Sequence, residues 1–157
     1  MDLDHTRPDG VSDGTVEAVG TLSEALEWVE RARGRLYDLH QMIGHADLLL
    51  DEAADQLEAA GHREHAERLR EELIGRNVLD GRWTFQVVEE FDRLYYGAFR
   101  HIEGQVRDDL VAGRRHVFEA ELKERRRSRG RAGHEHRPPL AHDPQVPTVP
   151  PAPAANG

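Results

Sequence analysis

The chain contains no cysteine, and this absence excludes several kinds of chemistry. Disulfide bonds, thiolate nucleophiles and zinc–thiolate centres all require cysteine. The sequence also lacks any apolar run close to the ~18–20 residues that cross a bilayer. Its acidic N-terminus is not followed by an apolar segment of the kind found in secretory signals. We therefore expect a cytoplasmic protein without a membrane span.

Motifs that mark enzymes are missing as well. The sequence has no glycine-rich phosphate loop, nucleophile elbow or dinucleotide fingerprint. Ten histidines are present, but none follows a glutamate by three residues, as the di-iron bundle pattern requires. None belongs to a His-Glu-x-x-His sequence either. We expect a protein without enzymatic activity and without a cofactor.

Lysine is almost absent, since Lys123 is the only one among 21 basic residues. Such a composition, rich in arginine, alanine and glycine, indicates a bacterial protein encoded in a GC-rich genome. The charge is unevenly distributed: residues 1–60 carry 14 acidic and 4 basic side chains, whereas residues 113–157 carry 5 acidic and 9 basic ones. An acidic first part and a basic last part favour a role in interactions.

The most regular pattern lies in residues 21–60, where two apolar rows repeat every seven residues. We call the first the leucine row: Leu22, Val29, Leu36, Ile43, Leu50 and Leu57. We call the second the alanine row: Ala25, Ala32, Leu39, Ala46, Ala53 and Ala60. Six heptads of this spacing predict one long helix with a seam for a partner helix. Thr21 and Glu24 form a capping-box pattern that predicts its start.

Two further helices are predicted. A short one runs from about His62 to Ile74, and a third begins at Thr84, with Thr84 as its cap and Trp83 just outside. The apolar residues of the third helix cover about half of its circumference, more than the ~100° stripe of an ordinary surface helix. They are Val88, Phe91, Leu94, Tyr95, Ala98, Phe99, Ile102, Val106 and Leu110. So wide an arc requires two neighbours.

These patterns predict an all-α protein, a long antiparallel helical hairpin or coiled-coil-like bundle of about three helices. The helical domain is predicted in residues 21–127. Residues 1–20 are predicted to be a disordered acidic arm, and residues 128–157 a disordered tail, basic at first and then proline-rich. A dimer formed through the heptad seam would cover both the seam and the wide arc.

Asp92 falls within that apolar arc, and a buried carboxylate needs a partner. The candidates are Arg33, Arg35, His40 or a tyrosine hydroxyl. An alternative interpretation places a metal or small-ligand site across the helices, built from His40, Asp47 and Asp92.

Aromatic and arginine residues gather beside the turn before the third helix, where Trp83 and Phe85 follow Arg76 and Arg82. Exposed tryptophan and arginine side chains are enriched where proteins bind partners. These four residues are therefore a candidate partner-binding site.

A basic segment is the candidate site for an anionic partner. It consists of Arg114, Arg115, Lys123, Arg125, Arg126, Arg127, Arg129 and Arg131. Such a segment can neutralise phosphates, although Glu119, Glu121 and Glu124 lie among the basic residues. The leading prediction for the whole chain is a non-enzymatic interaction or scaffold protein that associates with itself. A nucleic-acid-associated protein is the first alternative, and a helical metal or small-ligand site the second.

Overall fold

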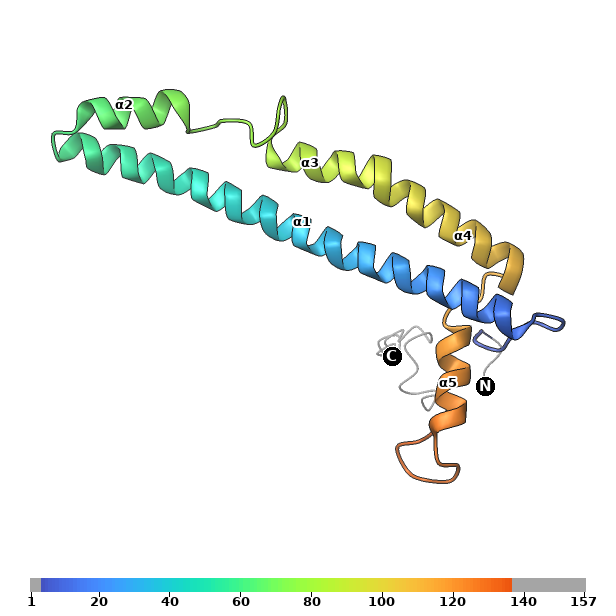
Figure 1. Cartoon of the computed structure of the whole chain (residues 1–157). Coiled ribbons are helices and arrows are strands. Elements are labelled where there is room, and N and C mark those ends of the chain that lie inside the picture. The colour runs from blue at the N-terminus through green and yellow to red at the C-terminus, as the bar shows by residue number, and fades with distance from the viewer. Residues whose placement is uncertain (1–3, 137–157) are drawn as a thin grey trace, which may run out of the picture. The chain divides into compact units, whose positions relative to one another are not determined.

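The computed structural model of the chain describes residues 4–136 (Figure 1). Its helices are α1 (Asp13–Ala59), α2 (Arg63–Glu72), α3 (Thr84–Phe91), η1 (Asp92–Tyr96), α4 (Gly97–Val111) and α5 (Val117–Arg126). No β-strand occurs in residues 4–136, so the all-α prediction is confirmed for this part of the chain. The predicted proline-rich tail lies outside the described residues from position 137 onward.

The number of helices differs from the prediction. The segments α3, η1 and α4 follow one another without a break, so they form one long helix. With α1, α2 and α5 the described residues contain four helices, not about three. The additional helix, α5, comes from the weak apolar pattern of Val117 and Leu122, which follows the break at Gly113.

Helix α1 begins earlier than the capping-box pattern predicted. The hydroxyl of Ser12 accepts a hydrogen bond from the backbone N–H of Thr15 at 3.1 Å, which satisfies one free N–H group of the first turn. The predicted start at Thr21 and the predicted disorder of residues 13–20 are therefore wrong. Gly34 and the other glycines within α1 do not interrupt it.

The start of α3 is shifted by one residue from the prediction. Trp83 is the N-cap residue, and its backbone N–H donates a hydrogen bond to Oε1 of Gln86 at 2.8 Å. Thr84, the predicted cap, is the first residue of the helix and is buried. Its hydroxyl is hydrogen-bonded to Nδ1 of His40 at 2.7 Å, so it joins two helices instead of capping one.

The π-helical turn η1 has a cause in the spacing of the residues that face α1. Thr84, Val88, Asp92 and Tyr96 are four residues apart. In an α-helix four residues rotate by about 400°, so each successive residue of this set would point about 40° further around the helix. A π-helical turn takes up one extra residue, which brings Glu103 back to the side that faces α1. The turn thus keeps the side that contacts α1 in line from Thr84 to Glu103.

By its internal contacts the chain divides into two units. Unit 1 comprises Met1–Gly20 and Arg107–Gly157, and unit 2 comprises Thr21–Val106. The divisions fall within α1 and within α4.

Unit 1 has a small core of four valines and one strong link between its two chain segments. The buried valines are Val16, Val19, Val111 and Val117. The Arg7 guanidinium donates two hydrogen bonds to the Glu121 carboxylate, both at 2.8 Å. Gly20 lies against Phe118: a Cβ at position 20 would stand 3.1 Å from the Cβ of Phe118, so a larger residue would displace the ring.

In unit 2, α1 lies alongside α3, η1 and α4 and runs in the opposite direction (Figure 1). Three side-chain contacts show the antiparallel direction, because the residue number of the contacted residue falls as the residue number on α1 rises. Ser23 contacts Glu103 at 2.9 Å, Arg33 contacts Asp92, and His40 contacts Thr84. The buried apolar residues of unit 2 are few: Leu26, Ala54, Ala66 and Val88.

Within residues 4–136, no helix combines the length and the apolar character needed to cross a membrane.

Candidate functional site

We call the long helix formed by α3, η1 and α4 the returning helix, because it runs back along α1. The side of α1 that faces this helix is marked by residues seven apart. We call Leu26, Arg33, His40, Asp47 and Ala54 the contact row. Its middle is polar, and each polar member has a defined partner. His40 binds the Thr84 hydroxyl, and Oδ1 of Asp47 accepts the backbone N–H of Gly75 at 2.9 Å.

Arg33 and Asp92 form the closest link of this row. Nε and Nη2 of Arg33 donate to Oδ1 and Oδ2 of Asp92 at 2.7 and 2.8 Å, a bidentate geometry. Of the candidate partners of Asp92, the structure shows Arg33, and each of the two side chains keeps 29% of its surface exposed. The Arg33 guanidinium lowers the pKa of the Asp92 carboxyl, against a smaller opposing effect of burial.

Beside this pair, Tyr96 and Glu30 form another link between the helices. The Tyr96 hydroxyl donates to Oε1 of Glu30 at 2.5 Å, and this carboxylate raises the pKa of Tyr96. The Arg33 guanidinium also lies over the Tyr96 ring, 4.9 Å from its centroid. The link therefore adds to the polar contacts that fix how the two helices align.

The three metal candidates are not brought together. His40, Asp47 and Asp92 each interact with a different partner, as given above. In residues 4–136 no group of three or more histidine and acidic side chains is arranged to hold a metal ion. His40 and Asp92 take part in bonds that join two helices, and Asp47 binds the turn that follows α2.

The alanine row lies away from the returning helix. Each of its members Ala25 to Ala53 directly precedes a member of the contact row, and one residue corresponds to a rotation of about 100°. Ala32, Leu39 and Ala46 are exposed accordingly. The leucine row stands four residues before the contact row, hence only about 40° from it, and is half-buried from Leu22 to Leu57.

A third row, apolar except for Arg35, extends the exposed surface of α1. We call Trp28, Arg35, Met42 and Leu49 the tryptophan row. Trp28 is 59% and Met42 63% exposed. This row was not predicted from the sequence, although its seven-residue spacing beside the alanine row was a signal that could have revealed it.

The returning helix also exposes large apolar residues. Leu94, Tyr95 and Ile102 are each more than half exposed, although all belong to the arc that the sequence predicted to be covered. Tyr95 and Ile102 directly precede Tyr96 and Glu103, which face α1. They are therefore turned about 100° from the contact side, in the same sense as the alanine row.

Because the two helices run in opposite directions, equal rotations in the same sense bring residues to the same side of the hairpin. The alanine row of α1 and Tyr95 and Ile102 of the returning helix therefore lie on one surface. We call it the apolar face, and its members are the alanine row from Ala25 to Ala53, the tryptophan row, Leu94, Tyr95, Ala98 and Ile102.

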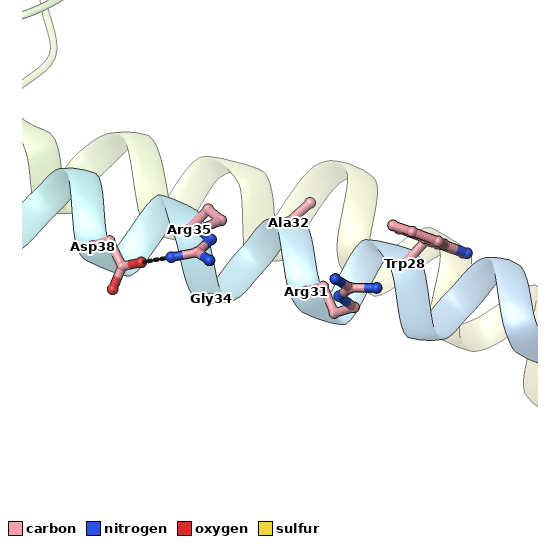
Figure 2. A pocket seen from close by; sticks show the side chains of 6 residues that line it. All are labelled: Trp28, Arg31, Ala32, Gly34, Arg35 and Asp38. Atoms are coloured by element: carbon pink, nitrogen blue, oxygen red, sulfur yellow. Dashed lines mark hydrogen bonds and ion pairs between the residues drawn. The ribbon is translucent and has the colours of Figure 1, made fainter.

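A shallow hollow on α1 borders this face (Figure 2). It is lined by Trp28, Arg31, Ala32, Gly34, Arg35 and Asp38, all from α1, and has a volume of about 530 Å³. Trp28, Arg31, Ala32 and Arg35 have the spacing i, i+3, i+4 and i+7. Four residues so spaced form the hole that receives a side chain of a partner helix in coiled coils.

The predicted partner site before the third helix is brought together only in part. Trp83 and Arg76 line one apolar groove of about 490 Å³ with Ile43, Ala46, Asp47, Leu50, Leu73, Asn77 and Val78. Phe85 is exposed outside this groove. Arg82 is held by the Glu90 carboxylate, and the pairing lowers the pKa of Glu90.

The eight residues of the predicted anion site all lie in unit 1, on α5 and the segments beside it. Some are engaged within the protein: Arg114 donates to the backbone carbonyl of Thr6, and Arg127 to the Glu124 carboxylate. Arg125 and Arg129 lie 3.9 and 3.4 Å from Glu121 and Glu124.

Comparison with known proteins identifies no relative, because no protein family, curated protein or solved structure matches this chain.

Proposed function

We propose that the protein is a non-enzymatic helical scaffold that associates with a second copy of itself through the apolar face. The observation that carries this proposal is the contrast between the few buried apolar residues of unit 2 and the exposed large apolar residues of its helices, such as Trp28, Met42 and Tyr95. Contiguous exposed apolar surface of this kind marks interaction sites in soluble proteins.

The size of the face supports an interaction site. From Ala25 to Ala53 the rows of α1 extend over about 40 Å at 1.5 Å per residue, and Leu94 to Ile102 on the returning helix extend over about 12 Å. With each helix about 10 Å wide, the face covers about 500 Å², the size of the exposed apolar patches that are often functional in monomers.

The pattern favours a second copy over an unrelated partner. A helix that fits the face needs apolar residues every seven positions over the same length, and α1 has them. The leucine and alanine rows offer large and small side chains beside each other, so two antiparallel copies of α1 can interlock in a twofold-symmetric interface. In such a four-helix arrangement a side chain of the partner helix would occupy the hollow over Ala32.

Analytical ultracentrifugation of matched glutamate variants tests the proposal. Leu39→Glu introduces a charge into the middle of the apolar face, whereas Leu48→Glu makes the same change at a residue that follows the contact row and is 69% exposed on the other side of α1. A carboxylate without a partner in a buried interface costs several kcal/mol, so we expect Leu39→Glu to raise the dimer dissociation constant ~100-fold or more.

The control variant Leu48→Glu should dimerise like the wild type. Equal weakening by both substitutions, or a wild-type protein that sediments as a monomer, would contradict the proposal. Circular dichroism of both variants checks that α1 remains helical.

A further inference from the structure

Two of the three acidic residues within the basic segment, Glu121 and Glu124, are paired with arginines inside the protein. Both oxygens of Glu121 accept hydrogen bonds from Arg7, and this pairing lowers the pKa of Glu121. Both oxygens of Glu124 accept hydrogen bonds from Arg127, with the same effect on its pKa. The two carboxylates therefore do not cancel the charge of the remaining cations.

Four cations of this region stay exposed and form no salt bridge with an acid among residues 4–136, although Lys123 has an electrostatic interaction with Glu135: Arg115, Lys123, Arg126 and Arg131. The ammonium group of Lys123 makes only a long contact of 3.4 Å, to the carbonyl of His136. Long cationic side chains that are free of internal acids are available to an external anion.

Lys123 and Arg126 line a hollow of about 370 Å³ together with Arg127 and His134. The backbone N–H of Ser128 donates to Nδ1 of His134 at 3.2 Å. Nδ1 is thus an acceptor, so a neutral His134 carries its proton on Nε2. The hollow therefore combines two free cations with a second type of donor, and Glu119 is the only acidic side chain among its lining residues.

We infer that this hollow and the four exposed cations around α5 bind the phosphate backbone of a nucleic acid. The inference is independent of the proposed self-association, since all of these residues belong to unit 1 and the apolar face belongs to unit 2. Arginine and lysine neutralise backbone phosphates irrespective of sequence, so the binding is non-specific.

The surroundings of the cations favour a nucleic acid over an anionic membrane. A helix that lies on a membrane needs an apolar face to insert. On α5 only Phe118 and Leu122 are large, apolar and exposed, and Phe118 packs against Gly20. Helix α5 therefore exposes Leu122 among Glu119, Lys123 and Arg126, which is not the apolar stripe that membranes select.

Fluorescence anisotropy with a labelled DNA duplex and the full chain tests the inference. Four phosphate contacts predict that log K falls with log salt with a slope of about −3.6, so a threefold rise in salt weakens binding about 50-fold. The double variant Lys123→Gln/Arg126→Gln should bind more weakly at every salt concentration. Its slope should be about −1.8, which is only about a 7-fold loss over the same range.

A matched control removes two arginines elsewhere. Arg63→Gln/Arg68→Gln changes the net charge equally, on α2 of unit 2, where both side chains are about three-quarters exposed. It should leave the slope unchanged. An equal loss in this control would overturn the inference, as would a duplex that does not bind. Vesicles of phosphatidylserine that bind in a Lys123- and Arg126-dependent manner, without binding of the duplex, would overturn it in favour of a membrane.

Discussion

The two sides of α1 differ in a way that composition alone does not reveal. The side that faces the returning helix carries Arg33, His40 and Asp47, each bonded to a particular group of the returning chain. The other side carries the alanine row and the tryptophan row, which are largely exposed, although Ala46 lines a groove with Leu73 and Trp83. The contact within one chain is thus the more polar one, and the exposed surface the more apolar one.

This difference separates two tasks that a helix surface performs. Hydrogen bonds between defined partners fix how two helices align, because a shift would leave those polar groups without partners. Apolar rows supply affinity but little positional information. In this protein the alignment of the hairpin rests on the polar contacts, and the apolar rows remain available for a partner.

The largest effect on the stability of the single chain should come from the covered side. Leu26→Ala removes a buried side chain, and we expect it to lower the free energy of unfolding by about 3 kcal/mol. Leu39→Ala is the same substitution on the apolar face and should change it by less than about 0.5 kcal/mol, since Leu39 is exposed in the single chain.

Urea unfolding of dilute protein measures both values, and sedimentation of concentrated protein should show the reverse order for dimer formation. If the two substitutions lowered the free energy of unfolding equally in dilute protein, the two sides of α1 would not differ in the way described.

A smaller effect is expected at the hydrogen bond between His40 and Thr84. Thr84→Val keeps the shape of this buried residue but removes the hydroxyl, and it should cost about 1 kcal/mol. In a double-mutant cycle with His40→Ala the two substitutions should couple, because they remove one interaction. Additive costs would mean that this bond does not hold the helices together.

The smallest effect should be the acid sensitivity that arises from Asp92. Arg33 holds the pKa of this carboxyl below its ordinary value of 3.8, so the folded protein favours the ionised form. The resulting stabilisation is fully present above about pH 3.8 and is lost as the pH falls through the lower pKa of the folded state.

Asp92→Asn should therefore lower stability at neutral pH and reduce the further loss below pH 3.8. Thermal unfolding at a series of pH values measures this, with Asp51→Asn as a control that makes no ion pair in residues 4–136. If the stability of Asp92→Asn depended on pH as that of the wild type does, the pair of Asp92 with Arg33 would contribute nothing to the acid sensitivity.

The all-α class and the long first helix were predictable, because six heptads leave few other interpretations. The true start of α1 was missed because Ser12 and Thr21 are equally good caps, and only the packing of Val16 and Val19 in unit 1 decides between them. The extra helix α5 was underestimated because its apolar pattern is short.

What the sequence could not predict was which neighbour each row of α1 faces. Periodicity shows that residues share a side of a helix, but it does not show which neighbour covers that side. The polar contact row was therefore invisible as a helix contact, although Arg33 was among the predicted partners of Asp92. The division of the basic segment into engaged and free cations likewise depended on Arg7, which is far away in the sequence.

Native mass spectrometry of the full-length wild-type chain tests the central claim most directly. If the apolar face joins two copies, the spectrum at micromolar concentrations will show a species of twice the chain mass of 17.8 kDa, and this species will disappear in Leu39→Glu but not in Leu48→Glu. A species of 17.8 kDa alone, at every concentration at which the protein can be measured, would contradict the claim.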